Sequence, residues 1–232
     1  MNAKALLLDC GGVMVYPPTG DWTLTEDMRE ILGEDFLEKH LEEYRRARKP
    51  FDFLIPDSHR IEDGTAERAL MECFYRRVFA AMGREYTDAQ YDRLTLSQTQ
   101  AGKYALFDDV KAFLARWQGQ ITLGIVSDAP PSTRTILREA GVLQYIDAFT
   151  FSFQVGCCKP EAAIYRRTLD LLGVSAADAV FVDDVIGNLR GAQALGVRCI
   201  QMRRSMPERY RTDAQWDGPV AHNFAELEAL LG

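Results

Sequence analysis

The sequence predicts an α/β fold, a doubly wound parallel (Rossmann-like) sheet with an all-helical cap domain inserted after the first strand. Short apolar runs alternate with helical patterns in the second half of the chain, whereas residues 17–99 show almost no strand pattern. A chain of 232 residues is long enough for one sizeable core and an insert. We therefore expect a core formed by residues 1–16 and 100–232 and a helical cap formed by residues 17–99.

The core prediction depends on buried strands separated by helices. Five apolar runs are predicted as strands: Ala5–Leu8, Ile121–Val126, Ala148–Phe153, Ala179–Val182 and Val197–Gln201. The helical stretches between them include one whose buried face is marked by Val110, Phe113, Leu114 and Trp117. Strands that alternate with helices favour a parallel sheet covered on both faces. The carboxyl ends of such strands meet at one edge, where folds of this class bind ligands.

The predicted cap has helical periodicity throughout. Leu37, Leu41 and Tyr44 fall at i, i+4 and i+7 of one expected helix, and residues 70–78 repeat a similar spacing. The basic run Arg45–Lys49 is typical of a solvated helix end. The segment Pro17–Gly20 is a natural linker into the insert.

Composition narrows the classes of partner and compartment. The net charge of −7 argues against nucleic acid and anionic membranes, although a small anionic ligand can still bind a locally positive site. Five cysteines without regular spacing do not form a disulfide framework, which indicates reduced thiols and a cytoplasmic location. No apolar run approaches the roughly 18 residues that a transmembrane helix requires.

Four polar signals follow predicted strands or open a helix. Asp9 follows the first strand and Ser127 follows the second, while Lys159 precedes a helix. Asp183 and Asp184 end the fourth strand, and Asn188 comes four residues after Asp184. Each signal alone is common as a helix cap or turn former. Together, at one edge of one sheet, they supply a nucleophilic carboxylate, oxygen ligands for Mg²⁺, and cationic and hydroxyl donors for a phosphoryl group.

These residues also carry a family resemblance. The segments LLLDCGGVMV, LGIVSDA, CCKPEAAIY and VFVDDVIGNLRGAQALGV resemble, in order, the four motifs of the haloacid dehalogenase-like hydrolase superfamily. The resemblance spans residues 4–16 and 105–205. The insert after the first motif is similar to the helical cap of this superfamily. The DD-x-x-x-N form resembles most the branch with sugar-phosphate phosphatases and the phosphatase domain attached to some epoxide hydrolases.

The resemblance implies a role for each matched residue. Asp9 would be the nucleophile, Ser127 would bind the phosphoryl group, and Lys159 would steady both. The metal ligands for Mg²⁺ would be Asp9, Asp184 and the backbone carbonyl of Gly11. Three further residues would support this site: Asp183, Asn188 and Asp128. The implied substrate is a small phosphorylated metabolite.

Gly11 departs from the pattern of the phosphatases in this superfamily. They usually carry a second aspartate here, which protonates the leaving alcohol and later deprotonates water. Such acid–base help typically contributes about 10²–10⁴-fold. Three interpretations follow: a phosphatase with a slower step or with an acid from elsewhere, a 2-haloacid dehalogenase whose halide needs no proton, or a non-catalytic protein that binds a phosphorylated ligand. The dehalogenases need no Mg²⁺ and tend to lose the acidic pair that Asp183 and Asp184 form here.

Substrate recognition is expected in the cap, where no motif stands out. A less regular stretch with Phe51, Phe53, His59 and Arg60 is a hypothetical substrate-facing segment. Cys10 lies beside the expected nucleophile, but no histidine or phosphate-cradling cysteine loop accompanies it, so we interpret it as a small packing residue.

Overall fold

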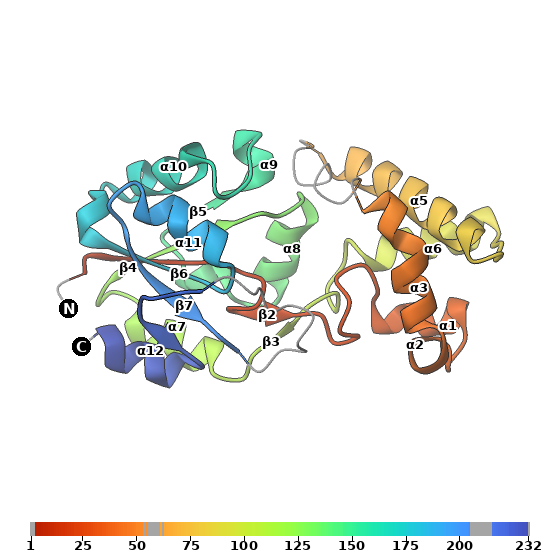
Figure 1. Ribbon diagram of the computed structural model, residues 1–232, viewed down its shortest axis with the longest axis horizontal. Coiled ribbons are helices and arrows are strands. Elements are labelled where there is room, and N and C mark those ends of the chain that lie inside the picture. Colours follow the sequence, from red (N-terminus) through yellow and green to blue (C-terminus); the bar gives the residue numbers. More distant parts are fainter. Residues whose placement is uncertain (1–2, 53, 55–60, 62, 205–214, 232) are drawn as a thin grey trace. The chain divides into compact units, whose positions relative to one another are not determined.

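The computed structural model describes residues 3–52, 54, 61, 63–204 and 215–231 of the chain. Six parallel strands form one sheet in the order β5-β4-β1-β6-β7-β8 (Figure 1). The strands are β1 Ala5–Leu8, β4 Thr122–Ser127, β5 Ala148–Phe151, β6 Ala179–Asp183, β7 Arg198–Met202 and β8 Val220–Ala221. The chain fills one side of β1 first and then the other, so β1 lies at a topological switch point. The predicted α/β fold class is confirmed.

The observed strands differ from the predicted ones mainly at their ends. β4 and β7 are each shifted by one residue from the predicted range. The predicted strand to Phe153 is wrong, because β5 ends at Phe151 and the chain turns into the short helix α9 (Ser152–Val155). β8 was not predicted, since its two residues are too few to give an apolar pattern.

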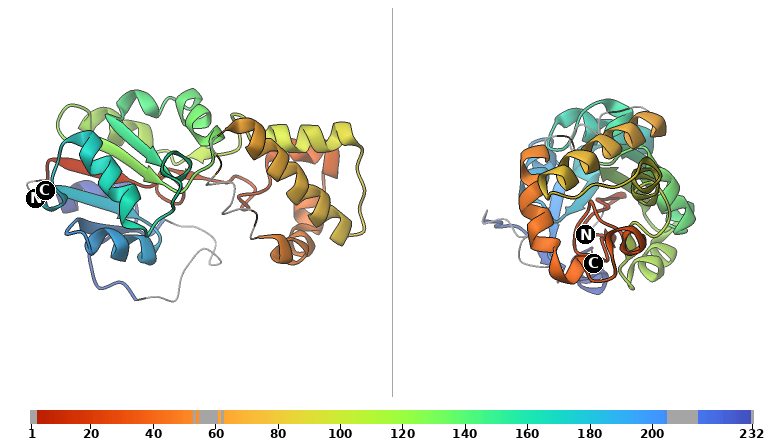
Figure 2. Two further views of the ribbon diagram at one scale, coloured as in Figure 1. Left: turned by 90° about the horizontal axis from the view of Figure 1, so that it is seen from above. Right: turned by 90° about the vertical axis from the view of Figure 1, so that its right-hand side faces the viewer.

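Helices cover both faces of the sheet (Figures 1 and 2). On one face, α10 (Ala162–Leu172) and α11 (Ile186–Gln193) pack against side chains that include Leu7 and Phe181. The other face carries α7 (Val110–Trp117) and α12 (Phe224–Leu231), joined by stacked Phe113 and Phe224 rings with centroids 4.3 Å apart. Because successive side chains of a strand point to opposite faces, the fully buried β1 serves both layers. Two 3₁₀ turns, Leu143–Tyr145 and Ala176–Asp178, lie in the connections between these strands and helices.

The chain divides into two compact units. The first contains residues 1–16, 106–128 and 141–232, and the second contains residues 17–105 and 129–140. Residues 100–105 and 129–140, which were predicted to belong to the core, group with the second unit. One reason is that Glu67 accepts hydrogen bonds from the Ser132 amide at 2.9 Å and the Ser132 hydroxyl at 2.6 Å. That this helical unit acts as a cap stays a prediction.

The described secondary structure of the second unit is helical apart from Ala105, its last residue before the chain returns to the first unit. Its α-helices are α1 Arg29–Leu32, α2 Phe36–Lys39, α3 Leu41–Arg48, α5 Gly64–Ala81, α6 Asp88–Ser97 and α8 Ser132–Glu139, with 3₁₀ turns Glu26–Met28 and Lys49–Phe51. The single helix predicted through Leu37 and Tyr44 is interrupted at His40, where α2 ends and α3 begins. The strands β2 (Val15–Tyr16) and β3 (Ala105–Leu106) pair where the chain passes between units. Of the hypothetical substrate-facing segment, Phe53, His59 and Arg60 lie outside the described residues.

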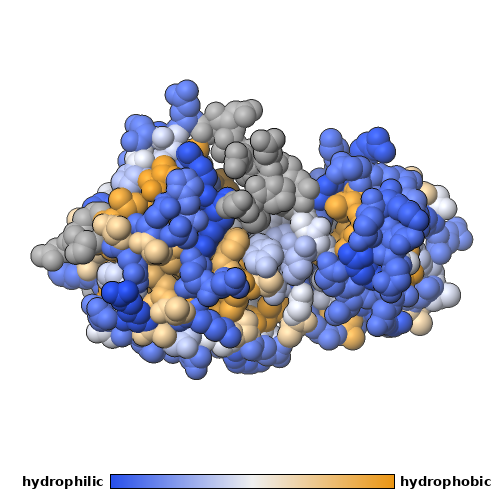
Figure 3. Space-filling view, turned by 90° about the horizontal axis from the view of Figure 1, so that it is seen from below, coloured by the Kyte–Doolittle hydropathy of each residue, from blue (hydrophilic) through white to orange (hydrophobic). Residues whose placement is uncertain are grey.

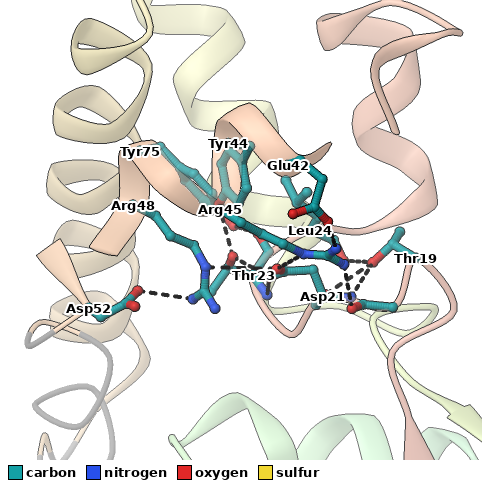
Figure 4. A network of polar contacts seen from close by, with 11 residues as sticks. Thr19, Asp21, Thr23, Leu24, Glu42, Tyr44, Arg45, Arg48, Asp52 and Tyr75 are labelled. Carbon is teal, nitrogen blue, oxygen red and sulfur yellow. Dashed lines mark hydrogen bonds and ion pairs between the residues drawn. The ribbon is translucent and has the colours of Figure 1, made fainter. Parts of the chain in front are cut away.

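A buried polar network fixes the start of the helical unit (Figure 4). The Asp21 carboxylate is 2% exposed and accepts hydrogen bonds from the Thr23 amide at 3.0 Å and hydroxyl at 2.8 Å. The Tyr75 hydroxyl, from α5, donates to the Thr23 carbonyl at 2.6 Å. Arg45 and Arg48 of α3 both form ion pairs with Asp21, at 3.4 and 3.8 Å. For these two arginines the expectation of a solvated helix end is wrong, because their charge compensates a buried carboxylate.

Large hydrophobic side chains are mostly buried. Among the described residues, the exposed ones are Leu96, Leu171 and Val185. On the face drawn in Figure 3, the helical unit is mainly hydrophilic, and hydrophobic residues are more frequent over the α/β unit. Within the described part of the chain, no helix combines the length and apolar character needed to span a bilayer.

Candidate active site

The sheet register places two carboxylates side by side at the carboxyl edge. Leu8 of β1 lies opposite Ile125 of β4 and Val182 of β6. The residue after β1 is Asp9 and the last residue of β6 is Asp183, so the pairing of β1 with β6 brings them to neighbouring positions. The Asp9 amide donates to the Val182 carbonyl at 2.9 Å. The predicted juxtaposition at this edge therefore follows from the parallel pairing itself.

The Lys159 ammonium joins these carboxylates. Its Nζ lies 2.7 Å from Oδ1 of Asp9 and 2.7 Å from Oδ2 of Asp183. The Lys159 amide donates to Oδ1 of Asp128 at 2.8 Å, which attaches the segment before α10 to the end of β4. The side chains of Lys159, Asp9 and Asp183 are 2%, 9% and 0% exposed, so these charges interact with little screening by solvent.

Asp183 is held by the first turn of α11. Its Oδ1 accepts a hydrogen bond from the Val185 amide at 2.7 Å, and the Asn188 side-chain amide lies 3.2 and 3.1 Å from its two oxygens. Asn188 is itself fixed, because its carbonyl accepts a hydrogen bond from the Tyr165 hydroxyl at 2.8 Å. Both carboxylate oxygens of Asp183 therefore contact groups of the protein itself, and this fixed carboxylate orients the Lys159 ammonium.

The site carries more negative than positive charge. Ligand oxygens of Asp9, Asp183 and Asp184 lie within 4.8 Å of one another. In the part of the chain that the structure describes, Lys159 is the cation that pairs with them, through Asp9 and Asp183. Burial, together with the neighbouring carboxylates, raises the pKa of Asp183 to about 7 and the pKa of Asp184 to about 8. Burial alone would lower the pKa of Lys159, but Asp183 and Asp9 outweigh it and hold this pKa well above its usual value.

A tight turn follows the Asp9 carboxylate. The Cys10 carbonyl accepts hydrogen bonds from the amides of Met14 and Val15 at 2.8 and 2.9 Å, and the Gly12 amide donates to the Val15 carbonyl at 2.9 Å. Gly12 has φ of 68°, in the left-handed region that favours glycine. A Cβ atom at Gly12 would lie 2.4 Å from Oδ2 of Asp184, so only glycine lets the turn approach this carboxylate.

The donor set fits a hard divalent cation. The carboxylates of Asp9 and Asp184 and the backbone carbonyl of Gly11 are oxygen donors of the kind that Mg²⁺ prefers. Apart from its ion pair with Lys159, the buried Oδ1 of Asp9 accepts no hydrogen bond from the described residues. The excess negative charge also matches a cation. These residues could therefore hold Mg²⁺.

Ser127 is the last residue of β4 and is buried. Cys10 is buried, and burial together with the Asp9 carboxylate raises the pKa of its thiol far above the usual range. A thiol with such a pKa stays protonated at neutral pH and is a poor nucleophile. The interpretation of Cys10 as a packing residue agrees with this environment.

Comparison with known proteins identifies the family. Residues 3–196 match the sequence profile of a hydrolase family described as haloacid dehalogenase-like hydrolase. The chain belongs to this family. The resemblance inferred from the four motifs is confirmed. The roles that it implies for Asp9, Lys159 and the acidic pair stay predictions.

Several curated proteins that are similar to this chain carry phosphatase names. A phosphoserine phosphatase from Thermus thermophilus is 30% identical over 107 residues, covering 45% of this chain and 43% of that protein. A phosphoglycolate phosphatase from Yersinia pseudotuberculosis is 30% identical over 154 residues, covering 66% of this chain and 64% of that protein. The chain thus spans about half the length of the first curated relatives it matches.

Solved structures share the fold over nearly the whole chain. A phosphatase from Thermococcus onnurineus has a TM-score of 0.64 at 23% identity, covering 99% of this chain and 98% of that one. An L-2-haloacid dehalogenase from Xanthobacter autotrophicus has a TM-score of 0.71 at 16% identity, with the same coverage. At these identities the likeness shows the fold and does not separate the two activities.

Two residues near the site were missed by the sequence reasoning. Gly12 was overlooked beside Gly11, although a glycine immediately after a strand-end carboxylate is a signal for close backbone approach. Gln201 of β7 donates from Nε2 to the Asp184 carbonyl at 3.2 Å, which supports the acidic pair from the neighbouring strand. Its position near the carboxyl end of a predicted strand was the available signal.

Replacing Gly12 with alanine should destabilise the protein by about 1–3 kcal/mol, because a left-handed alanine is strained and its Cβ displaces Asp184. Urea unfolding in the presence of EDTA measures this change. Gly187→Ala is the matched control, since a Cβ at this helical position meets no atom within 4 Å and alanine favours helix. Equal stability of the two variants would contradict the close-approach argument.

Proposed function

We propose that the protein is a Mg²⁺-dependent phosphatase that acts on a small phosphorylated metabolite through a phosphoryl-aspartate at Asp9. The observation that carries the proposal is the surplus of carboxylates, two buried and one half-buried, around the one ammonium that pairs with them among the described residues. This surplus is costly while the carboxylates are ionised, and a bound divalent cation would stabilise the ionised form. Displacement of a halide from carbon needs no such cation. The phosphatase names of the relatives from Thermus and Yersinia support the same choice.

In the first step, a carboxylate oxygen of Asp9 attacks phosphorus, an Asp9 O–P bond forms, and the ester P–O bond breaks. The electron pair of the broken bond leaves with the alkoxide or aryloxide. Lys159 keeps the Asp9 carboxylate in place by its ion pair and supplies positive charge to the transferring group. The Ser127 hydroxyl donates a hydrogen bond to a phosphoryl oxygen. Asp183 orients the Lys159 ammonium through its own ion pair.

Bound Mg²⁺, held by Asp9, Asp184 and the Gly11 carbonyl, would neutralise charge between the nucleophile and an anionic substrate. In the second step water attacks phosphorus, the Asp9 O–P bond breaks, and phosphate leaves with Asp9 restored as a carboxylate. The attacking water must lose a proton in this step. Gly11 offers no side chain to accept that proton, so this step depends on solvent or on the departing phosphate.

The dehalogenase alternative has one observation in its favour, which is Gly11 itself. A halide leaves without a proton, so the missing acid would cost nothing in that reaction. The acidic pair argues against it, because Asp183 and Asp184 are retained and lie beside Asp9. A non-catalytic role in binding a phosphorylated ligand would use the same charges without turnover. Release of halide, or release of neither halide nor phosphate, distinguishes these alternatives from the phosphatase.

Replacing Asp9 with asparagine should reduce Mg²⁺-dependent phosphate release by about 10³-fold or more, because the amide is not a nucleophile. The assay measures release from p-nitrophenyl phosphate and a panel of sugar phosphates, with Mg²⁺ and with EDTA. Asp170→Asn, at an exposed position of α10, is the matched control and should keep wild-type activity. Release of halide from 2-haloacids without phosphate release would favour the dehalogenase, and no release of either would favour the binding role.

Gly11 should make the enzyme selective for substrates with good leaving groups, such as aryl and acyl phosphates, over alkyl phosphates. Gly11 is not among the glycines with positive φ, so the backbone there accepts an aspartate. Gly11→Asp should narrow the ratio of aryl to alkyl rates by up to about 10²–10⁴-fold. Gly11→Asn has the same size without the acid and should leave the ratio unchanged. Equal aryl and alkyl rates in the wild type would show that an acid comes from elsewhere.

A further inference from the structure

Arg204 is a buried cation that holds the backbone of the turn after Asp9. It follows β7 and is 8% exposed. Its Nε and Nη2 both donate to the carbonyl of Val13, at 3.2 and 3.0 Å. Val13 lies 191 residues earlier in the chain, inside the turn that includes Gly11 and Gly12. A permanently charged side chain thus binds a backbone atom of the candidate active site.

The remaining contacts leave the guanidinium one orientation. Its Nη1 donates to Oδ2 of Asp109 at 2.8 Å, and the same oxygen accepts the Phe224 amide at 2.9 Å. The guanidinium carbon lies 4.3 Å from the ring centroid of Phe107 and 4.9 Å from that of Phe224. Asp109 compensates the buried charge, and the rings fix the plane of the fork. Arg204 therefore connects the turn to the starts of α7 and α12.

Few rotatable bonds separate Val13, which Arg204 holds, from the proposed cation ligands. Gly11 and Gly12 precede Val13 directly, and hydrogen bonds to the Cys10 carbonyl and the Val15 carbonyl close the turn around them. Gly12 is in contact distance of the Asp184 carboxylate. A shift of Val13 would therefore move the Gly11 carbonyl and change the approach of the turn to Asp184.

We propose that Arg204 is a positioning residue, which fixes the Gly11 carbonyl and the Gly12 backbone against Asp184 and so sets the affinity of the site for a divalent cation. This inference rests on the cation site of the proposed function. In this proposal Arg204 acts through its hydrogen bonds to Val13 and contacts neither the substrate nor the cation.

The test measures cation binding to the protein without substrate. Mn²⁺ is the probe, because its free aquo ion is counted by electron paramagnetic resonance, and Mg²⁺ serves as competitor. Arg204→Met removes the three hydrogen bonds but keeps an apolar stem between the rings. We expect it to weaken Mn²⁺ binding by about 10–100-fold, the effect that residues supporting metal ligands commonly have. Arg204→Lys should recover part of this loss, since one ammonium can reach one of the two acceptors.

Arg190→Met is the matched control. Arg190 also lies over an aromatic ring, 5.1 Å from the centroid of Trp216, and pairs with a carboxylate, but it is on the exposed side of α11. The Arg190→Met variant should bind Mn²⁺ with the affinity of the wild type. Asp109→Asn keeps Arg204 and removes the charge that orients it, so it should weaken binding in the same direction. This variant decides the question if Arg204→Met does not fold.

The outcomes separate this inference from the proposed function. Unchanged Mn²⁺ affinity in folded Arg204→Met or Asp109→Asn, with normal phosphate release by the wild type, would overturn the role of Arg204 alone. A wild type that releases no phosphate, with weakened Mn²⁺ binding in the variants, would overturn the phosphatase and leave this role standing. A wild type that binds no Mn²⁺ would overturn the inference as well.

Discussion

One ammonium group, that of Lys159, lies 2.7 Å from oxygens of two buried carboxylates while a third carboxylate closes the cluster. The charges of Asp9, Asp183 and Asp184 exceed what this ammonium can compensate, and burial makes the excess costly. Burial in the first place, and the neighbouring carboxylates after it, raise the pKa values of Asp183 and Asp184. The surplus of carboxylates also fits a divalent cation. The two buried carboxylates differ in their other contacts, since Asp183 also accepts hydrogen bonds from the Val185 amide and the Asn188 side chain. In the proposed reaction Asp9 is the nucleophile.

The fold brings these charges together through backbone geometry. Parallel pairing of β1 with β4 and β6 ends the three strands at one edge, so a residue that follows each strand enters the same site. The turn from Cys10 to Val15 then approaches Asp184 at a distance that only Gly12 permits. Gly11, one residue earlier, gives the turn a carbonyl but no acid. In the proposed mechanism the same short segment would contribute to cation binding and would limit proton transfer.

The sequence predicted the parts of the site that depend on local pattern. Asp9, Asp183 and Asp184 directly follow apolar runs. In a parallel sheet, residues that follow neighbouring strands lie together at the carboxyl edge. Contacts between distant segments were beyond this reasoning. The pairing of Arg45 with Asp21 makes a basic helix end partly buried, and the hydrogen bonds from Ser132 to Glu67 move α8 into the helical unit. Arg204 shows the same limit, because nothing local to residue 204 indicates a carbonyl at residue 13.

The most direct test of nucleophilic attack by Asp9 is chemical trapping of the phosphoryl-aspartate. Because Gly11 provides no base for the second step, the intermediate should accumulate during turnover of an aryl phosphate. Acid quenching followed by borohydride reduction converts an acyl phosphate to an alcohol, and mass spectrometry of the peptide with residue 9 reports the product. We expect homoserine in place of Asp9 only when substrate is present. Steady release of phosphate with residue 9 unchanged at every time point would contradict it.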